Sequence, residues 1–239
     1  KDMRDVNNIA LEVIKRSENV FVNYILAQEN KINKSGIYFA SKFVKSLSKL
    51  SNNGFENFRF GTLFNCQPNA PYFPFTYSSG KDGFSIALEL IPVWINIINQ
   101  SRNNNLEYYR DCITKELIPK LKEINDICIH IAKVTDTEYY GIDCSLAPFP
   151  DNENGSVVGL YEKLGSDGFG SPGTVFLTSY LTNIIKNIII ESKIKSIGFN
   201  GVMFSLLEDY LLSKNNNKRD FSIDSLISYS TVCGCGLDM

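Results

Sequence analysis

The apolar residues of this chain recur with two spacings, one typical of helices and the other typical of strands. Apolar positions three or four residues apart predict helices over residues 5–28, 36–51, 105–134, 156–164, 172–191, 203–214 and 223–232, with one more starting near Pro92. Alternating apolar positions predict strands over 56–65, 84–90, 138–147 and 194–202. This mixture of helices and strands indicates an α/β fold with a largely covered sheet.

The two faces of each predicted strand differ in the same way. In the strand over 138–147, Ile142 and Leu146 fall on an apolar face, whereas Gly141 and Asp143 fall on the opposite face. In all four strands this opposite face is built mainly from Gly, Ala and Ser, and its strongly polar members are Arg59, Glu89, Asp143 and Asn200. Small residues indicate close approach of a ligand or of other backbone, so we expect the polar groups to converge on an enclosed cavity. A sheet with one solvated face is the alternative.

Composition and charge limit the classes of protein to which the chain can belong. Of its 239 residues, 44% are hydrophobic and 21% are charged, as in an ordinary soluble globule. We expect one α/β domain over 1–239, with a helical N-terminal part (1–52) and a core (53–239). The net charge of −2 gives no general attraction to nucleic acid or to an anionic membrane. With no apolar run long enough to span a bilayer and no signal peptide, we expect a cytoplasmic protein, and both ends indicate that the natural chain extends further.

The last loop of the sequence, "CGCG" at 233–236, carries two of the six cysteines. A zinc site there would need two more ligands from distant strands, and a single histidine, His130, makes histidine-based metal sites or triads hard to build. We therefore expect free thiols, no structural zinc, and His130 in the core. Because Cys233 follows a predicted helix C-terminus, its thiol pKa is expected to be raised unless a cation such as Arg59 lies near. A plain glycine turn is the alternative for this loop.

Six sequence blocks together resemble one family. They are "NFRFGTLFNCQPNAPYFPFTY" (57–77), "FSIALEL" (84–90), "GIDCSLAPFP" (141–150), "GFGSPGTVFLTSYLT" (168–182), "GFNGVMFSLLED" (198–209) and "SLISYSTVCGCGLDM" (225–239). They resemble domain-of-unknown-function family 711, which is grouped with the pyruvate formate-lyase-like glycyl radical enzymes. The resemblance implies a barrel-like or strongly curved sheet covered by helices, similar to the ten-stranded barrel of those enzymes and incomplete in this chain. The radical-glycine motif of those enzymes is absent, which argues against radical chemistry.

The resemblance also assigns weight to particular residues. The family's pattern at the last loop is Cys-Gly-small-Gly-Leu-Asp, so Cys233 and Asp238 match it and Cys235 is a local substitution. Residues typical of the family also fall on Arg59, Asn65, Glu89, Asp143, Glu208 and Asp209. The family itself has no established activity, so the resemblance implies no reaction.

The main functional hypothesis is an enzyme that acts on a small polar or anionic metabolite in a closed cavity. Cys233 would act as a nucleophile or hydrogen donor, and Asp143 or Glu89 as the acid–base group. The predicted substrate-binding residues are Arg59, Asn65, Ser171 at a helix N-terminus, Asn200 and Asp238.

Two alternatives use the same residues differently. The cavity could hold a ligand in a non-catalytic binding or assembly protein, or the carboxylates of Glu89, Asp143 and Asp238 could bind Mg²⁺ or Ca²⁺. The sequence does not identify a cofactor, so whether one binds stays open. The expected partner is a small molecule, neither nucleic acid nor a membrane is expected, and a homo-oligomer is compatible with the composition.

Overall fold

The computed structural model describes residues 3–71, 76–149 and 152–236, and the chain forms two compact units, Lys1–Gly80 and Lys81–Met239. The sequence predicted a single domain with a helical part over 1–52. The boundary after Gly80 separates two hydrophobic cores, one in each unit, and the single domain stays a prediction. The mixed α/β class predicted from the sequence is confirmed.

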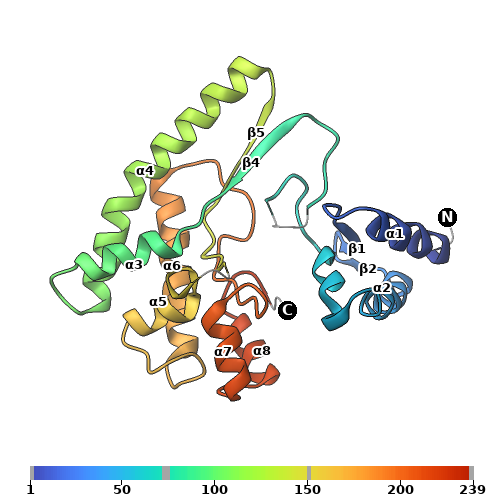
Figure 1. Ribbon diagram of the computed structural model, residues 1–239. Coiled ribbons are helices and arrows are strands. Elements are labelled where there is room, and N and C mark those ends of the chain that lie inside the picture. The colour runs from blue at the N-terminus through green and yellow to red at the C-terminus, as the bar shows by residue number, and fades with distance from the viewer. Residues whose placement is uncertain (1–2, 72–75, 150–151, 237–239) are drawn as a thin grey trace. The chain divides into compact units, whose positions relative to one another are not determined.

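The first unit combines a small sheet with two helices (Figure 1). Its elements are α1 (Met3–Arg16), β1 (Val22–Gln28), β2 (Lys31–Ile32), α2 (Lys34–Leu47), the 3-10 helix η1 (Asn52–Arg59) and β3 (Phe60–Phe64). The strand order is β2-β1-β3, with β1 antiparallel to β2 and parallel to β3.

One helix predicted in this unit is wrong in its second half. Helical spacing over 5–28 predicted a continuous helix, but α1 ends at Arg16 and the chain returns as strand β1. Tyr24 and Leu26 alternate toward the core, where the Tyr24 ring stacks on Phe43 at 5.7 Å between centroids and meets the edge of Phe60 at 5.1 Å. Aromatic packing and pairing with β3 therefore outweigh local helix propensity.

Arg59 holds the connection between α1 and β1. Its buried guanidinium donates hydrogen bonds to the carbonyl oxygens of Ile14 (3.0 Å), Ser17 (2.6 Å) and Val20 (2.9 and 3.1 Å), and pairs with Glu56 at 3.0 Å. Because the three carbonyls lie at and just after the end of α1, one side chain satisfies backbone groups that the helix leaves unpaired. The Arg59 side chain is thus engaged in contacts within the first unit.

The second unit contains the remaining elements (Figure 1). They are β4 (Gly83–Ala87), α3 (Ile91–Gln100), α4 (Leu106–Thr135), β5 (Glu138–Asp143), the 3-10 helix η2 (Glu153–Gly155), α5 (Val157–Lys163), α6 (Thr174–Ser192), α7 (Tyr210–Lys218) and α8 (Ile223–Ser230). Strands β4 and β5 are parallel, and the long helix α4, which continues through Pro119, packs against β5, α3 and α6. The core of this unit includes the fully buried side chains of Trp94, Leu121, Ile142, Tyr161, Phe169 and Phe204.

The four predicted strands do not share one sheet. Among the described residues, β3 belongs to the sheet of the first unit, whereas β4 and β5 form a separate parallel pair, and no closed barrel is present. The predicted strand over 194–202 meets β5 at an isolated bridge, Ile142 with Ser196, and meets the segment after β5 at another, Leu146 with Val202. Left-handed backbone at Gly198 (φ 95°) and Asn200 (φ 52°) turns this segment out of the extended conformation.

Asp209 ties two helices of the second unit together. Its buried carboxylate accepts hydrogen bonds from the Ser156 hydroxyl (2.5 Å) and Val157 N–H (2.8 Å) at the start of α5, and from Leu212 N–H (3.0 Å) at the start of α7. Burial raises the pKa of this carboxyl group, although its hydrogen bonds act in the opposite direction. Asp209 therefore caps α7 and also binds Ser156, the N-cap residue of α5, and the first N–H of that helix, which explains Asp209 without a catalytic role.

We expect Asp209→Ala to lower the free energy of unfolding by about 2 to 4 kcal/mol, because it removes the N-cap of α7 and leaves the buried Val157 N–H at the start of α5 unsatisfied. Chemical denaturation of the two proteins measures the difference. The matched control is Asp167→Ala in an exposed loop, with an expected change within about 0.5 kcal/mol. Equal effects of the two substitutions would contradict the capping role.

We expect Arg59→Lys to lower the free energy of unfolding of the first unit by about 2 to 4 kcal/mol, since a lysine cannot reproduce the forked contacts to three carbonyls. Hydrogen exchange at the amides of α1 and β1 should report the loss locally. Arg16→Lys is the control, because the Arg16 side chain is 82% exposed. A silent Arg59→Lys would show that the guanidinium is not a structural anchor.

Candidate functional site

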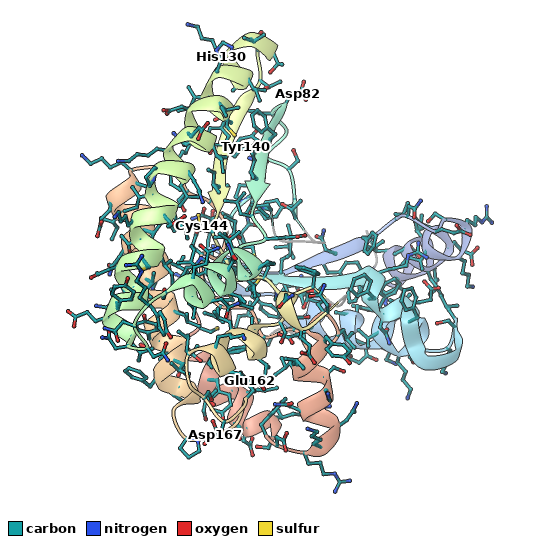
Figure 2. All side chains as sticks on the ribbon, turned by 60° about the vertical axis from the view of Figure 1, so that its left-hand side comes forward. Asp82, His130, Tyr140, Cys144, Glu162 and Asp167 are labelled. Carbon is teal, nitrogen blue, oxygen red and sulfur yellow. The ribbon has the colours of Figure 1, made fainter. Side chains whose placement is uncertain are left out.

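Three segments of the second unit meet at the end of β5. They are residues 143–146, the turn over 198–202, and the cysteine loop, by which we mean residues 233–236. Leu146 N–H donates to the Gly201 carbonyl at 2.8 Å, and Val202 N–H donates to the Cys233 carbonyl at 2.7 Å. Figure 2 labels Cys144, which lies directly after β5. Backbone hydrogen bonds thus place the cysteine loop against the turn that follows α6.

Asp143 holds the turn over 198–202 in position. Its buried carboxylate accepts four hydrogen bonds: from Ser145 N–H (2.8 Å), the Ser145 hydroxyl (2.6 Å), Phe199 N–H (3.1 Å) and Asn200 N–H (3.1 Å). A Cβ atom at Gly198 would lie 2.2 Å from one carboxylate oxygen, so only glycine fits there. The arrangement makes Asp143 a positioning residue whose charge is met by local donors.

Asn200 completes the same turn from the other side. Its side-chain carbonyl accepts a hydrogen bond from Cys144 N–H at 2.9 Å, and its amide group donates to the Ile197 carbonyl at 3.2 Å. The structure therefore brings Asp143 and Asn200 together, as the strand pattern predicted. Their side chains, however, form hydrogen bonds with backbone groups of each other's segment and do not line a cavity in common.

Gly201 allows the cysteine loop to approach. A Cβ atom at this position would lie 2.2 Å from the Cys233 carbonyl oxygen and 2.9 Å from the Cys235 sulfur. The Thr182 hydroxyl, from α6, donates a second hydrogen bond to the Cys233 carbonyl at 3.1 Å. Gly201 was not on the predicted face of small residues, yet it is where another stretch of backbone, the cysteine loop, comes closest to this segment.

The Cys233 sulfur has both acceptors and donors around it, and its thiol can donate to the carbonyl oxygens of Ser230 at 3.3 Å and Gly236 at 3.5 Å. Cys235 N–H lies 3.3 Å and Gly236 N–H lies 3.2 Å from the sulfur, and the Cys235 thiol donates a further hydrogen bond. The thiol hydrogen bond, followed by the backbone donors, lowers the pKa of Cys233 to about 6 although burial opposes this. The expectation of a raised pKa from the helix dipole was wrong, because these close donors outweigh the terminus of α8.

Cys235 has the opposite character. Its hydrogen bond to Cys233, its burial and the nearby Asp143 carboxylate all raise its thiol pKa well above the ordinary value, with a smaller opposing contribution from the Ser145 hydroxyl. Cys233 is consequently the anionic member of the pair and Cys235 is the neutral hydrogen-bond donor. Both are free cysteines, as are the other four in the chain, Cys66, Cys112, Cys128 and Cys144.

The other predicted site residues do not join this arrangement. Glu89 is exposed and lies two residues beyond Ala87, which pairs with Asp143 across β4 and β5. Asn65 belongs to the first unit, where its side chain accepts a hydrogen bond from Asn30 N–H at 3.2 Å. Asp238 lies outside the described residues.

The Ser171 hydroxyl donates to the Gly168 carbonyl at 2.7 Å within its own loop. The cap of α6 is Gly173 (φ 103°) rather than Ser171, because the helix begins only at Thr174. A contact between the Ser171 hydroxyl and a bound anion, as predicted, would therefore require the loop to rearrange.

Sequence reasoning missed three contributors to the site: Ser145, Thr182 and Gly201. The two glycines of "GFNG" (198–201) could have signalled a turn instead of a strand, since Gly198 and Asn200 both favour left-handed backbone. The hydroxyl groups carried no such signal. His130, predicted in the core, is exposed near the end of α4 (Figure 2).

Within 3–71, 76–149 and 152–236, no group of three or more His, Cys, Asp or Glu side chains is placed to hold a metal ion. None of the helices in these ranges has the length and apolar character needed to cross a bilayer.

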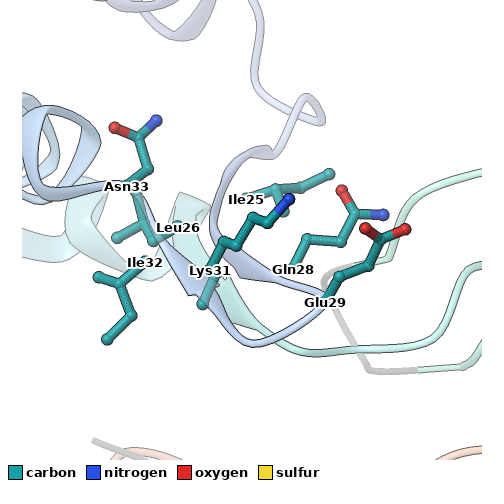
Figure 3. A pocket seen from close by; sticks show the side chains of 8 residues that line it. Ile25, Leu26, Gln28, Glu29, Lys31, Ile32 and Asn33 are labelled. Carbon is teal, nitrogen blue, oxygen red and sulfur yellow. The ribbon is translucent and has the colours of Figure 1, made fainter.

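The first unit carries a surface pocket of about 440 Å³ around the turn between β1 and β2 (Figure 3). Its wall includes two residues of opposite charge, Glu29 and Lys31, next to apolar Ile25 and Ile32. None of the predicted site residues lines it, so the pocket gives no support to the predicted cavity.

Comparison with known proteins places the chain in a family. UPF0210 proteins are among its relatives: that of Pyrobaculum islandicum is 22% identical over 190 residues, covering 76% of this chain and 41% of the relative. The UPF0210 protein of Lactiplantibacillus plantarum is 31% identical over 98 residues, covering 41% of this chain and 22% of the relative. The chain thus spans less than half of the length of these relatives. Since the profile described as "Uncharacterised ACR (DUF711)" matches residues 1–239, the protein belongs to the uncharacterised DUF711 family.

Proposed function

We propose that this chain carries the thiol centre of an enzyme that acts on a small polar or anionic metabolite, with Cys233 as the reacting thiolate. The observation that carries the proposal is the set of donors around the Cys233 sulfur, namely two backbone N–H groups and the Cys235 thiol. Thiolates are the nucleophilic form of cysteine, and donors of this kind are a recognised means of stabilising them.

The proposed chemistry is attack of the Cys233 sulfur on an electrophilic carbon of the substrate. The electron pair displaced by the new C–S bond takes up a proton from water, because Glu89, the predicted acid–base group, lies outside the arrangement around Cys233. Asp143 acts by positioning the turn over 198–202, since four donors already occupy its carboxylate. Asp238 keeps its predicted substrate-binding role.

The finer architecture is part of the same proposal. We infer that β4 and β5 form part of the barrel-like sheet implied by the family resemblance, because parallel strand pairs normally belong to larger sheets covered on both faces. A reducing, cytoplasmic location fits a free thiolate. Radical chemistry is not included, since the radical-glycine motif is absent from the sequence.

A non-catalytic binding protein is the second candidate, and one observation favours it. The Cys233 side chain is 0% exposed, so the thiolate could serve to hold a loop against a ligand without reacting. Small molecules that copurify with the protein, identified by mass spectrometry and then tested for turnover, would separate the two candidates. Retention of an unchanged ligand by both the wild type and Cys233→Ser would favour binding alone.

We expect the ultraviolet absorbance of thiolate to rise in a step with a midpoint near pH 6, the pKa of Cys233. Cys233→Ser should remove this step, whereas Cys66→Ser should leave it unchanged, because burial raises the pKa of Cys66. A wild-type titration with no step below about pH 8 would overturn the proposed thiolate.

The same pKa predicts how stability depends on pH. The folded-state pKa of Cys233 lies below the ordinary value of 9.0, so the thiolate contributes stability that is fully present above pH 9 and is lost as the pH falls through about 6. We therefore expect Cys233→Ser to destabilise the protein more at pH 9 than at pH 6. Denaturant titrations of both proteins at the two pH values measure this, and a difference that grows toward acid pH would contradict it.

A further inference from the structure

In the proposed reaction Cys235 serves only as a hydrogen-bond donor to the Cys233 sulfur, and no bond to its own sulfur forms or breaks. The family's pattern calls only for a small residue at this position, and this chain places a second thiol there. Of the two cysteines, Cys233 is fully covered and Cys235 is partly exposed. The pair therefore combines a fully covered residue with a partly exposed one whose sulfur lies against Gly201.

We propose that Cys233 and Cys235 form a redox pair, in which a peroxide oxidises Cys233 and Cys235 then closes a reversible disulfide within the cysteine loop. This inference concerns a modification of the loop and holds whether or not Cys233 attacks a metabolite.

The geometry of the loop brings the two sulfurs together. Gly234 adopts a left-handed backbone (φ 85°), so the chain reverses and Cys235 N–H points at the Cys233 sulfur across 3.3 Å. The Cys235 thiol also donates a hydrogen bond to that sulfur. Two cysteines separated by one residue form a strained disulfide in an extended chain, and glycines on both sides of Cys235 supply the backbone freedom that relieves this strain.

The two thiols are prepared for different steps. Cys233, with the lowered pKa, is the better nucleophile toward a peroxide, while Cys235 stays protonated and available for the second step. Cys144 is poorly suited to either step, because burial and the adjacent Asp143 carboxylate raise its pKa to about 12.

The electrons and atoms balance as follows. The Cys233 thiolate attacks one oxygen of the peroxide, whose O–O bond breaks, giving Cys233 sulfenic acid and, after protonation, an alcohol or water. The Cys235 sulfur then attacks the Cys233 sulfur, the S–O bond breaks, and water leaves with the thiol proton. Overall the two cysteines lose two electrons to the peroxide, and a dithiol reductant returns them.

Access favours a small oxidant. Cys233 is fully covered, so an oxidant that reaches its sulfur has to be small, and the neighbouring Gly234 and Gly236 are exposed and have no side chains. Bulky disulfide reagents should instead be confined to the partly exposed Cys235.

The test uses the full chain, treated with a small excess of hydrogen peroxide and then with a reagent that blocks free thiols. Mass spectrometry of the peptide that contains both cysteines should show the loss of two hydrogens and no blocking groups, and dithiothreitol should reverse the change. Cys66→Ser, the matched control, should give the same product.

Cys235→Ser removes the resolving thiol but keeps Cys233. In this variant the sulfenic acid at Cys233 should persist and be trapped by dimedone, whereas wild type should give little adduct. The proposal is overturned if wild type accumulates the dimedone adduct, if oxidation joins Cys233 to another cysteine or chain, or if Cys235→Ser oxidises like wild type. Since the thiolate titration is a separate measurement, failure here leaves the proposed function standing, whereas a failed titration together with a reversible disulfide would overturn the proposed function and leave only the order of oxidation to be reassigned.

Discussion

A buried carboxylate that must be satisfied by neighbouring donors is the constraint on which the site depends. Asp143 stands at the end of β5, where burial makes an unpaired charge too costly to keep. The chain meets this cost by folding the turn over 198–202 around it, so that Phe199 and Asn200 offer their N–H groups. The cysteine loop then packs against this turn, because Val202 N–H donates to the Cys233 carbonyl and Gly201 has no side chain to block the approach. Asp143 thus sets the position of the thiol centre indirectly, through this turn.

Much of the helical content could be predicted from the sequence, because α2, α4, α6 and α8 have long apolar stripes whose period is unambiguous. The errors arise where a short apolar run fits both periods. The segment now known as β1 fitted a helix until the aromatic contacts of Tyr24 fixed its alternation. The segment over 194–202 alternates like a strand but contains a turn, because Gly198 and Asn200 adopt positive φ angles.

The candidate site was predictable in part, and the reason is physical. Alternation places residues on a face, so it found the nearness of Asp143 and Asn200, which lie on bridged segments. It could not show that Arg59 belongs to another sheet, nor that its guanidinium is used by backbone carbonyls of the α1–β1 connection. The expected pKa of Cys233 failed for a related reason: a helix dipole can be read from a sequence, whereas three donors converging on one sulfur require a folded loop.

The cysteine loop is fastened by its main chain. The carbonyl oxygen of Cys233 accepts the hydrogen bonds from Val202 and Thr182, while its sulfur contacts N–H groups of the loop, the Cys235 thiol and the carbonyl oxygens of Ser230 and Gly236. Anchorage and reactivity therefore reside in different atoms of the same residue. The two hydrogen bonds to the Cys233 carbonyl do not involve the sulfur. A change of charge, alkylation or oxidation at the sulfur therefore does not by itself remove the contacts that hold the loop.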